Sequence, residues 1–209
     1  MRVNEELAKH VGGRLSDFVQ GLLQSFGPDL RLGGGFIRDT LRGETCDLVE
    51  LYPRNQKAAA AVVEALENST SYAATRDEGK DVYAFPVYDA GGEETLELFV
   101  CRQEKVFVPS KNLVNYFDLS VNQAVLFWQN GWRLEATKEF LRDVQQGYLT
   151  VLAPNERTLF RAVALLNAGG YQLAVGDLAK ALLPVLVADR ERQFELFELP
   201  GFLSGDEEW

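Results

Sequence analysis

Three consecutive glycines, Gly33 to Gly35, constrain the fold of this chain more than any other short stretch. They separate a short apolar run, residues 30–32, from a run with helical spacing, residues 36–41. A glycine turn between a strand and a helix allows backbone conformations that other residues avoid, and it exposes N–H groups at the start of the helix. The stretch therefore predicts a strand–turn–helix unit, in which the glycines either cradle a phosphate or serve steric needs alone.

The rest of the chain alternates predicted strands and helices, which indicates an α+β (mixed α/β) fold. Strands are expected at residues 30–32, 46–52, 72–75, 82–88, 95–101, 121–128 and 132–135. Helices are expected at residues 5–26, 36–41, 56–66, 138–144, 157–168, 177–190 and 193–198, with Gly12-Gly13 as a weak point in the first. Because the pattern is helical from residue 155 onward, we expect a head domain, residues 1–153, followed by an all-helical segment, residues 154–209.

The composition excludes several classes of function. The chain has 209 residues, of which 46% are hydrophobic, so it can bury an ordinary core. Its net charge of -10 repels phosphate backbones, and we therefore expect RNA binding to be weak or absent. No apolar run approaches the ~18 residues that span a bilayer, and the N-terminal residues lack an apolar signal core. These features predict a cytoplasmic protein with no membrane contact.

Carboxylates are the only side chains that could form a metal site here. One histidine and two cysteines, Cys46 and Cys101, cannot assemble a zinc site at familiar spacing, and carboxylates favour a hard cation such as Mg²⁺. The candidates are Asp47 and Glu50 on one predicted strand and Glu97 on a later one. Asp47 and Glu50 would point to opposite faces of a regular strand, so only a β-bulge would bring both to one ion.

The order of these parts resembles a known family. The stretch "GGFIRDTLRG…CDLVEL" is similar to the opening of the class II CCA-adding enzymes and bacterial poly(A) polymerases, in the polymerase-β-like nucleotidyltransferase superfamily. The residues that match that opening in order and spacing are Gly34, Gly35, Arg38, Asp39, Leu41 and Gly43. Later stretches, "LELFVCR", "FDLSVNQAVLF", "LRDVQQGYLTVL" and "LFRAVALLNAGGY", resemble further motifs of the family in the same order. The resemblance covers residues 30–171.

This resemblance implies a fold and a set of site residues. The fold is a nucleotidyltransferase head with a mixed, largely antiparallel sheet flanked by helices, followed by a helical neck-like segment. The implied nucleotide- and phosphate-binding residues are Gly34, Gly35, Arg38, Asp39, Asp118, Asn122 and Arg161. The implied catalytic acids are Asp47, Glu50 and Glu97, which would hold Mg²⁺ in an active enzyme.

The paired carboxylates of the family are incomplete in this sequence. The family holds its metal ions with an Asp-x-Asp pair on one strand, because side chains at i and i+2 share a face. That pair falls here on Leu48 and Glu50, or on Asp47 and Val49 if the preceding loop is one residue shorter. Either alignment keeps one acid.

Two further positions depart from the family's pattern, and together they favour an impaired site. The arginine before the family's Asp-Phe-Thr motif is Phe117 here, and the base-reading signature maps onto residues 154–158 without its acids or its arginine. We therefore favour a catalytically impaired protein that binds a nucleotide such as ATP or CTP, or a protein partner. The alternative is an active Mg²⁺-dependent nucleotidyltransferase with an altered carboxylate site, which adds a nucleotide to an RNA 3′ end or another acceptor. A third possibility is an interaction module, or a homo-oligomer, that needs neither nucleotide nor metal.

Overall fold

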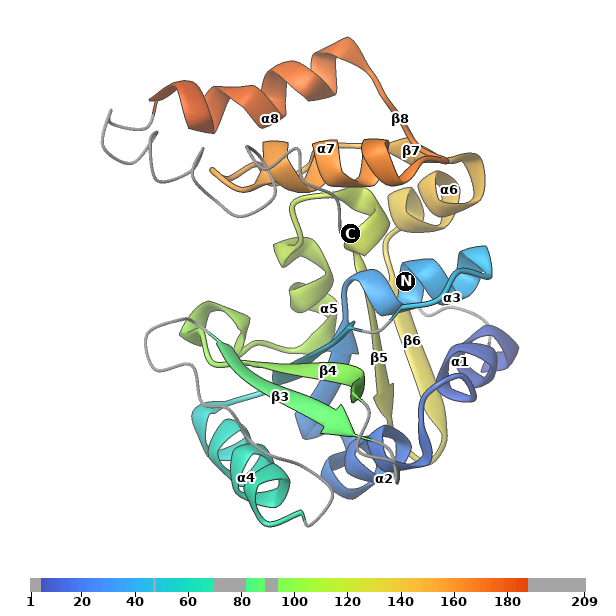
Figure 1. Cartoon of the computed structure of the whole chain (residues 1–209), viewed down its shortest axis with the longest axis vertical. Coiled ribbons are helices and arrows are strands. Elements are labelled where there is room, and N and C mark those ends of the chain that lie inside the picture. The colour runs from blue at the N-terminus through green and yellow to red at the C-terminus, as the bar shows by residue number, and fades with distance from the viewer. Residues whose placement is uncertain (1–4, 47, 70–81, 89–93, 188–209) are drawn as a thin grey trace.

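The chain folds around one mixed β-sheet (Figure 1). The computed structural model describes residues 5–46, 48–69, 82–88 and 94–187. Within these residues the sheet has six strands in the order β3-β4-β2-β1-β5-β6. The strands are β1 (Leu30–Gly33), β2 (Leu48–Pro53), β3 (Val82–Tyr88), β4 (Glu94–Cys101), β5 (Ala124–Trp128) and β6 (Trp132–Ala136). Among these neighbours β2 and β4 run parallel and the others antiparallel, which confirms the expected α+β fold with a largely antiparallel sheet.

Helices flank the sheet, and one of them differs from the sequence prediction. The helices of the head are α1 (Glu5–Gly12), α2 (Asp17–Phe26), α3 (Gly35–Arg42), α4 (Gln56–Glu67), α5 (Ser110–Leu113) and α6 (Lys138–Gln146). The single helix expected at residues 5–26 is two helices, because Ser16 begins a new one by accepting a hydrogen bond from the Val19 N–H. A Cβ atom at Gly12 would overlap the indole ring of Trp132 on β6, so glycine allows α1 to pack closely on the sheet.

The two faces of the sheet have different environments. On β2, Val49 and Leu51 are fully buried in the larger core, which α1 to α4 help to build. Tyr52 belongs instead to a smaller cluster on the other face, together with Phe117 and Val125. Because side chains alternate along a strand, Glu50 lies on the same face as Tyr52. This face, rather than the helix-covered core, can therefore carry a site.

The C-terminal part of the described chain forms a separate helical layer, visible above the sheet in Figure 1. It contains α7 (Thr158–Ala168) and α8 (Val175–Val187), which pack against each other. The segment is not purely helical, because β8 (Gln172–Leu173) pairs in parallel with β7 (Tyr148–Leu149). The strand expected at residues 72–75 and the helix expected at residues 193–198 lie outside the described residues, and the boundary at residue 153 stays a prediction.

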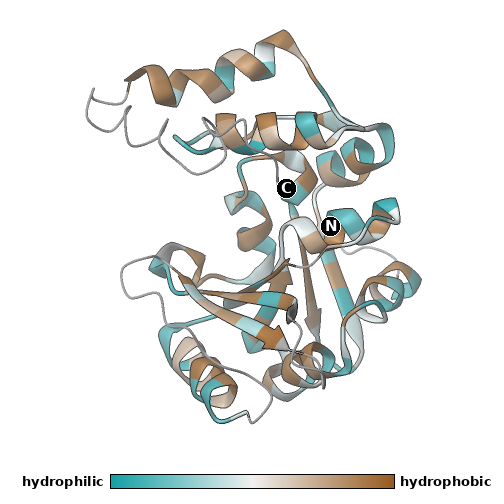
Figure 2. Cartoon of the chain, viewed as in Figure 1, coloured by the Kyte–Doolittle hydropathy of each residue, from teal (hydrophilic) through white to brown (hydrophobic). Residues whose placement is uncertain are grey.

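One surface of the helical layer is apolar. Figure 2 shows mostly apolar residues along α8, and Leu183, Leu186 and Val187 are each more than half exposed. In the part of the chain that the structure describes, no helix combines the length and the apolar character that a membrane crossing requires.

Candidate functional site

The glycine turn joins β1 to α3 and faces a glutamate of β2. Gly34 caps the N-terminus of α3 with φ of 75°, a backbone conformation that residues other than glycine rarely adopt. In the antiparallel register of β1 and β2, Gly33 lies opposite Glu50. A Cβ atom at Gly34 would overlap Glu50 Oε2, so the carboxylate lies directly against the turn. The turn predicted from the three glycines is therefore present, and its nearest polar neighbour is an acid.

Arg38 and Asp39 brace the start of α3. The Arg38 guanidinium donates from Nε to Asp39 Oδ1 at 2.5 Å and from Nη2 to Asp39 Oδ2 at 2.9 Å, a two-bond fork. Its third nitrogen, Nη1, donates to Asn122 Oδ1 at 3.0 Å. Arg38, Asp39 and Asn122, which the resemblance implied, are thus brought together beside the glycine turn. Their contacts fix the guanidinium in place, whether or not it also meets a phosphate.

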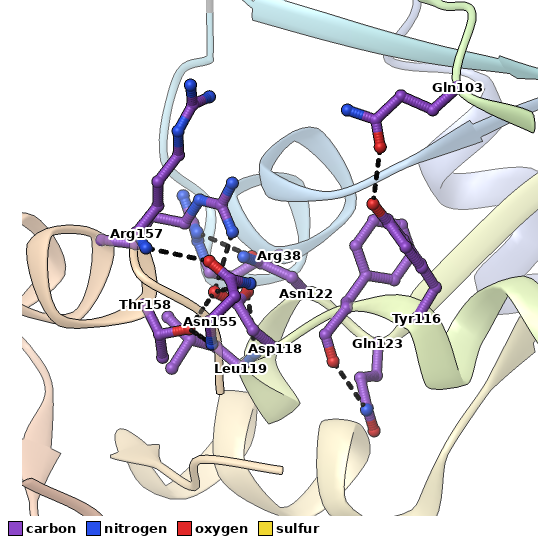
Figure 3. A network of polar contacts seen from close by, with 12 residues as sticks. Arg38, Gln103, Tyr116, Asp118, Leu119, Asn122, Gln123, Asn155, Arg157 and Thr158 are labelled. Atoms are coloured by element: carbon purple, nitrogen blue, oxygen red, sulfur yellow. Dashed lines mark hydrogen bonds and ion pairs between the residues drawn. The ribbon is translucent and has the colours of Figure 1, made fainter. Parts of the chain in front are cut away.

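Asp118 is buried and joins the head to α7 (Figure 3). Its Oδ2 accepts hydrogen bonds from Thr158 Oγ1 at 2.8 Å and from Arg161 Nη1 at 2.8 Å, and the Asn155 side chain lies at 3.4 Å. Its Oδ1 accepts from the Leu119 N–H at 3.1 Å. Asp118 and Arg161 are therefore paired as structural partners at the edge of the site.

Asp143 binds Ser120, in the segment that follows Asp118. It accepts hydrogen bonds from Ser120 Oγ at 2.5 Å and from Arg142 Nε at 2.5 Å, and Ser120 Oγ in turn accepts from the Thr150 N–H at 3.1 Å. Burial by itself would raise the pKa of Asp143, but the hydrogen bonds from Arg142, Ser120 and Thr150 outweigh it and lower that pKa. The carboxylate thus stays charged and keeps the segment in position.

The site changes the pKa of the Glu50 carboxyl. Burial raises the pKa of its carboxyl above the ordinary value, while the nearby Arg161 charge, a hydrogen bond with Tyr52 and the Arg38 charge act in the opposite direction. The Tyr52 hydroxyl is itself buried, and burial together with the Glu50 charge raises its pKa well above the usual range. Burial and the Asp118 charge therefore outweigh the groups that favour the charged form of Glu50.

A pocket of ≈ 800 Å³ opens between this face of the sheet and the helical layer. Glu50 and Tyr52 line it from β2, the segment after α5 contributes Tyr116 and Asp118, and Arg161 lines it from α7. Its size matches the cavities that hold small-molecule ligands in proteins. The pocket combines aromatic surface with both signs of charge, which suits a ligand that has an apolar ring and a charged group.

Aromatic side chains take the place where the resembled family has an arginine. Phe117 is buried and meets Tyr52 edge-on, with 5.4 Å between the ring centroids, and Tyr116 lies 6.3 Å from it. A Cβ atom at Gly33 would be 2.8 Å from Phe117 Cζ, so the ring packs tightly on the glycine turn. The Tyr116 hydroxyl donates a hydrogen bond to Gln103 Oε1 at 2.9 Å, as Figure 3 shows. Phe117 therefore contributes packing and supplies no charge to the pocket.

The expected metal ligands are only partly described. Asp47 lies outside the described residues. On the parallel strands β2 and β4, Glu97 pairs with Leu48, and one further pair, Val49 with Leu98, separates them from Glu50 and Phe99. Within the described part of the chain, no three histidine, cysteine or acidic side chains come together as a metal site. The described donors thus do not match the paired carboxylates that two Mg²⁺ ions need.

Several residues of the site were not expected from the sequence. Tyr52 has a visible signal, because it follows Glu50 by two positions on a strand and must share its face. Thr158 and Asn155 bind Asp118 from about 40 positions away, and Tyr116 with Gln103 closes another side of the pocket. No local pattern indicates such long-range partners.

Comparisons with known proteins support the fold. No protein-family model and no curated protein matches the chain. A solved CCA-adding enzyme in complex with CTP is 15% identical, with a TM-score of 0.65, over 92% of this chain and 48% of that chain. The Thermotoga maritima CCA-adding enzyme complexed with tRNA is 15% identical, with a TM-score of 0.58, over 92% of this chain and 50% of its own. A tRNA nucleotidyltransferase with a primer tRNA and an incoming ATP analog is 18% identical, with a TM-score of 0.60, over 81% and 52%.

These likenesses define the class of fold. The chain has the fold of a nucleotidyltransferase head, similar to that of the CCA-adding enzymes. It spans about half the length of the solved chains it matches. A shared fold at this level of identity does not carry an activity with it, because site residues and packing residues are different sets.

Proposed function

We propose that this chain is a nucleotide-binding protein built on a nucleotidyltransferase head, with its two-metal transfer chemistry impaired. The observation that carries the proposal is the pair of positions Leu48 and Glu50 on β2. They share one face of the strand beside the glycine turn, but only one of them is an acid. A leucine offers no metal ligand, so the in-line transfer that two bridged Mg²⁺ ions promote lacks one of its supports.

Nucleotide binding is supported by the shape and chemistry of the pocket. The glycine turn begins α3, where N–H groups and the helix dipole favour an anion. Arg161 lines the same pocket, and the Tyr116 ring offers a surface on which a base can stack. The similar solved structures include complexes with CTP and with ATP. ATP and CTP are therefore the ligands we propose to test.

Calorimetry tests this proposal. ATP and CTP are titrated into the purified chain with Mg²⁺, and into an Arg161→Gln variant. We expect saturable binding by the native chain and weaker binding by the variant, since Arg161 would lose its charge toward the phosphates. Arg14→Gln is the matched control, because it removes the same charge from an exposed residue outside the pocket. Absence of any heat with either nucleotide would refute nucleotide binding.

The second candidate function is an active Mg²⁺-dependent nucleotidyltransferase with an altered carboxylate site. It is favoured by one observation, that Glu97 and Glu50 lie on adjacent parallel strands with one residue pair between them. Asp47 would complete this set of catalytic acids. The test is incorporation of labelled AMP or CMP into RNA 3′ ends in the presence of Mg²⁺, with Asp47→Ala/Glu50→Ala/Glu97→Ala as the comparison. Incorporation that disappears in the triple variant would establish this activity and contradict the impaired site.

Further properties belong to the same proposal. We propose a cytoplasmic protein that binds RNA weakly at most, because its net charge of -10 opposes phosphate backbones. A protein partner or a homo-oligomer is also proposed, and sedimentation of the purified chain tests the second of these.

A further inference from the structure

Glu50 lies against the glycine turn. A Cβ atom placed on Gly34 would lie 3.0 Å from Glu50 Cδ and would overlap Oε2, so the carboxylate is in contact with the backbone at the start of α3. The register of β1 and β2, with Gly33 opposite Glu50, places the side chain there. A phosphate received by this turn would need the same space.

Positive and hydrogen-bonding groups lie near Glu50, although its burial and the Asp118 charge outweigh them and raise the pKa of its carboxyl. The charges of Arg161 and Arg38 attract the carboxylate, and Tyr52 forms a hydrogen bond with it. The N-terminus of the eight-residue helix α3 adds a partial positive charge on the same side. Of these groups, Tyr52 and Arg161 also line the pocket that we propose for the nucleotide.

Among the described residues, no group of three metal-ligating side chains would hold a cation beside Glu50. The position two residues earlier on the same face is Leu48. A carboxylate that faces a polyphosphate without a bridging cation repels it. Without a bridging cation Glu50 would therefore repel a phosphate, whereas a metal ligand would help to bind it.

We propose that Glu50 is the built-in occupant of the glycine turn, and that a nucleoside triphosphate must compete with this side chain for the turn. The inference rests on the proposed nucleotide binding and names the residue that limits it. Glu50 then determines specificity: it weakens the binding of a triphosphate and leaves the binding of the uncharged nucleoside unaffected.

The test measures ATP and adenosine binding by calorimetry in EDTA, and then ATP binding with Mg²⁺. The variant is Glu50→Gln, which keeps the shape of the side chain and removes its charge. Unit charges a few ångström apart near a protein surface shift an equilibrium by tenfold or more, so we expect ATP to bind at least about tenfold more tightly to the variant. Adenosine should bind native and variant chains within about twofold. Glu64→Gln on α4 is the matched control, since it removes one negative charge from an exposed residue that does not line this pocket.

A second variant guards against a folding defect. Glu50→Asp keeps the charge but withdraws it from the turn by one methylene, so its affinity for ATP should lie between those of the native chain and Glu50→Gln. Thermal unfolding of each variant establishes that it is folded before it is titrated.

The outcomes separate this inference from the proposed function. Equal ATP affinities of the native chain and Glu50→Gln, with binding intact, would overturn the inference and leave nucleotide binding in place. An equal gain for adenosine would show a general loosening of the pocket and would also overturn it. Weaker ATP binding by Glu50→Gln with Mg²⁺ would make Glu50 a metal ligand instead. If neither chain binds ATP under any condition, the proposed function fails and the inference fails with it.

Discussion

Replacing Asp118 with alanine should destabilise the chain by about 2–5 kcal/mol, because this carboxylate joins the head to α7. The Thr158 hydroxyl, which has no exposed surface, would lose a charged acceptor at 2.8 Å, a loss of about 1.5–3 kcal/mol. The Leu119 N–H would lose its bond to Oδ1, at about 1 kcal/mol. Arg161 adds at most about 1 kcal/mol, because 47% of its side chain is exposed and water screens the pair.

Urea unfolding followed by circular dichroism measures this loss. For a chain of this size each kcal/mol lowers the melting temperature by about 2–4 °C, so a thermal scan provides an independent measure. Arg161→Ala is the matched control and should cost no more than about 1 kcal/mol. A stability of Asp118→Ala within about 0.5 kcal/mol of the native chain would refute the reasoning. A loss in Arg161→Ala as large as that in Asp118→Ala would also refute it, since the exposed pair and not the buried hydroxyl would then hold the two parts together.

Other perturbations test the glycine turn, a buried arginine and the loss of stability at low pH. Gly34→Ala should cost about 2–4 kcal/mol in urea unfolding, from its positive φ and from overlap with Glu50; adding Glu50→Ala should restore only the part due to overlap, and an unchanged urea midpoint in the single variant would contradict the close contact. Arg31 is buried and donates to four backbone carbonyls, so Arg31→Met should lower the free energy of unfolding by about 3–5 kcal/mol. The same change at the exposed Arg54 should lower it by under about 1 kcal/mol. Equal losses in the two variants would argue against the carbonyl network. Because the folded pKa of Asp143 lies below its ordinary value of 3.8, the stability it adds is complete above that value and is lost as the pH falls through the folded pKa. Urea midpoints measured between pH 2 and 6 should therefore fall less steeply toward acid in Asp143→Asn, and identical slopes would exclude this role.

The elements of the fold could largely be predicted from the sequence, because their signals are local. The glycine turn, the strand that carries Glu50 and the hairpin at Gly131 all follow from residue type and spacing within a few positions. The continuous first helix was wrong, because Ser16 caps the start of a second helix. What the sequence could not show is that Gly12 packs against the Trp132 ring, 120 positions further along the chain. No property of the residues around Gly12 indicates that contact.

The candidate site divides in the same way. Arg38, Asp39 and Asn122 were predicted as site residues from the sequence, and the structure brings these three together. The partnership of Asp118 with Thr158 and the aromatic packing of Phe117 on the glycine turn were not predicted, because they depend on which segments meet in space.

The sequence by itself determined that a glycine turn would stand between a strand and a helix, and that Leu48 and Glu50, two positions apart on the next strand, supply one acid between them. Both are matters of residue identity and short-range backbone preference. Only the tertiary structure decided where the Glu50 side chain lies. The antiparallel register that sets Gly33 opposite Glu50 places the carboxylate on Gly34, and a shift of one residue would turn that side chain to the other face of the sheet.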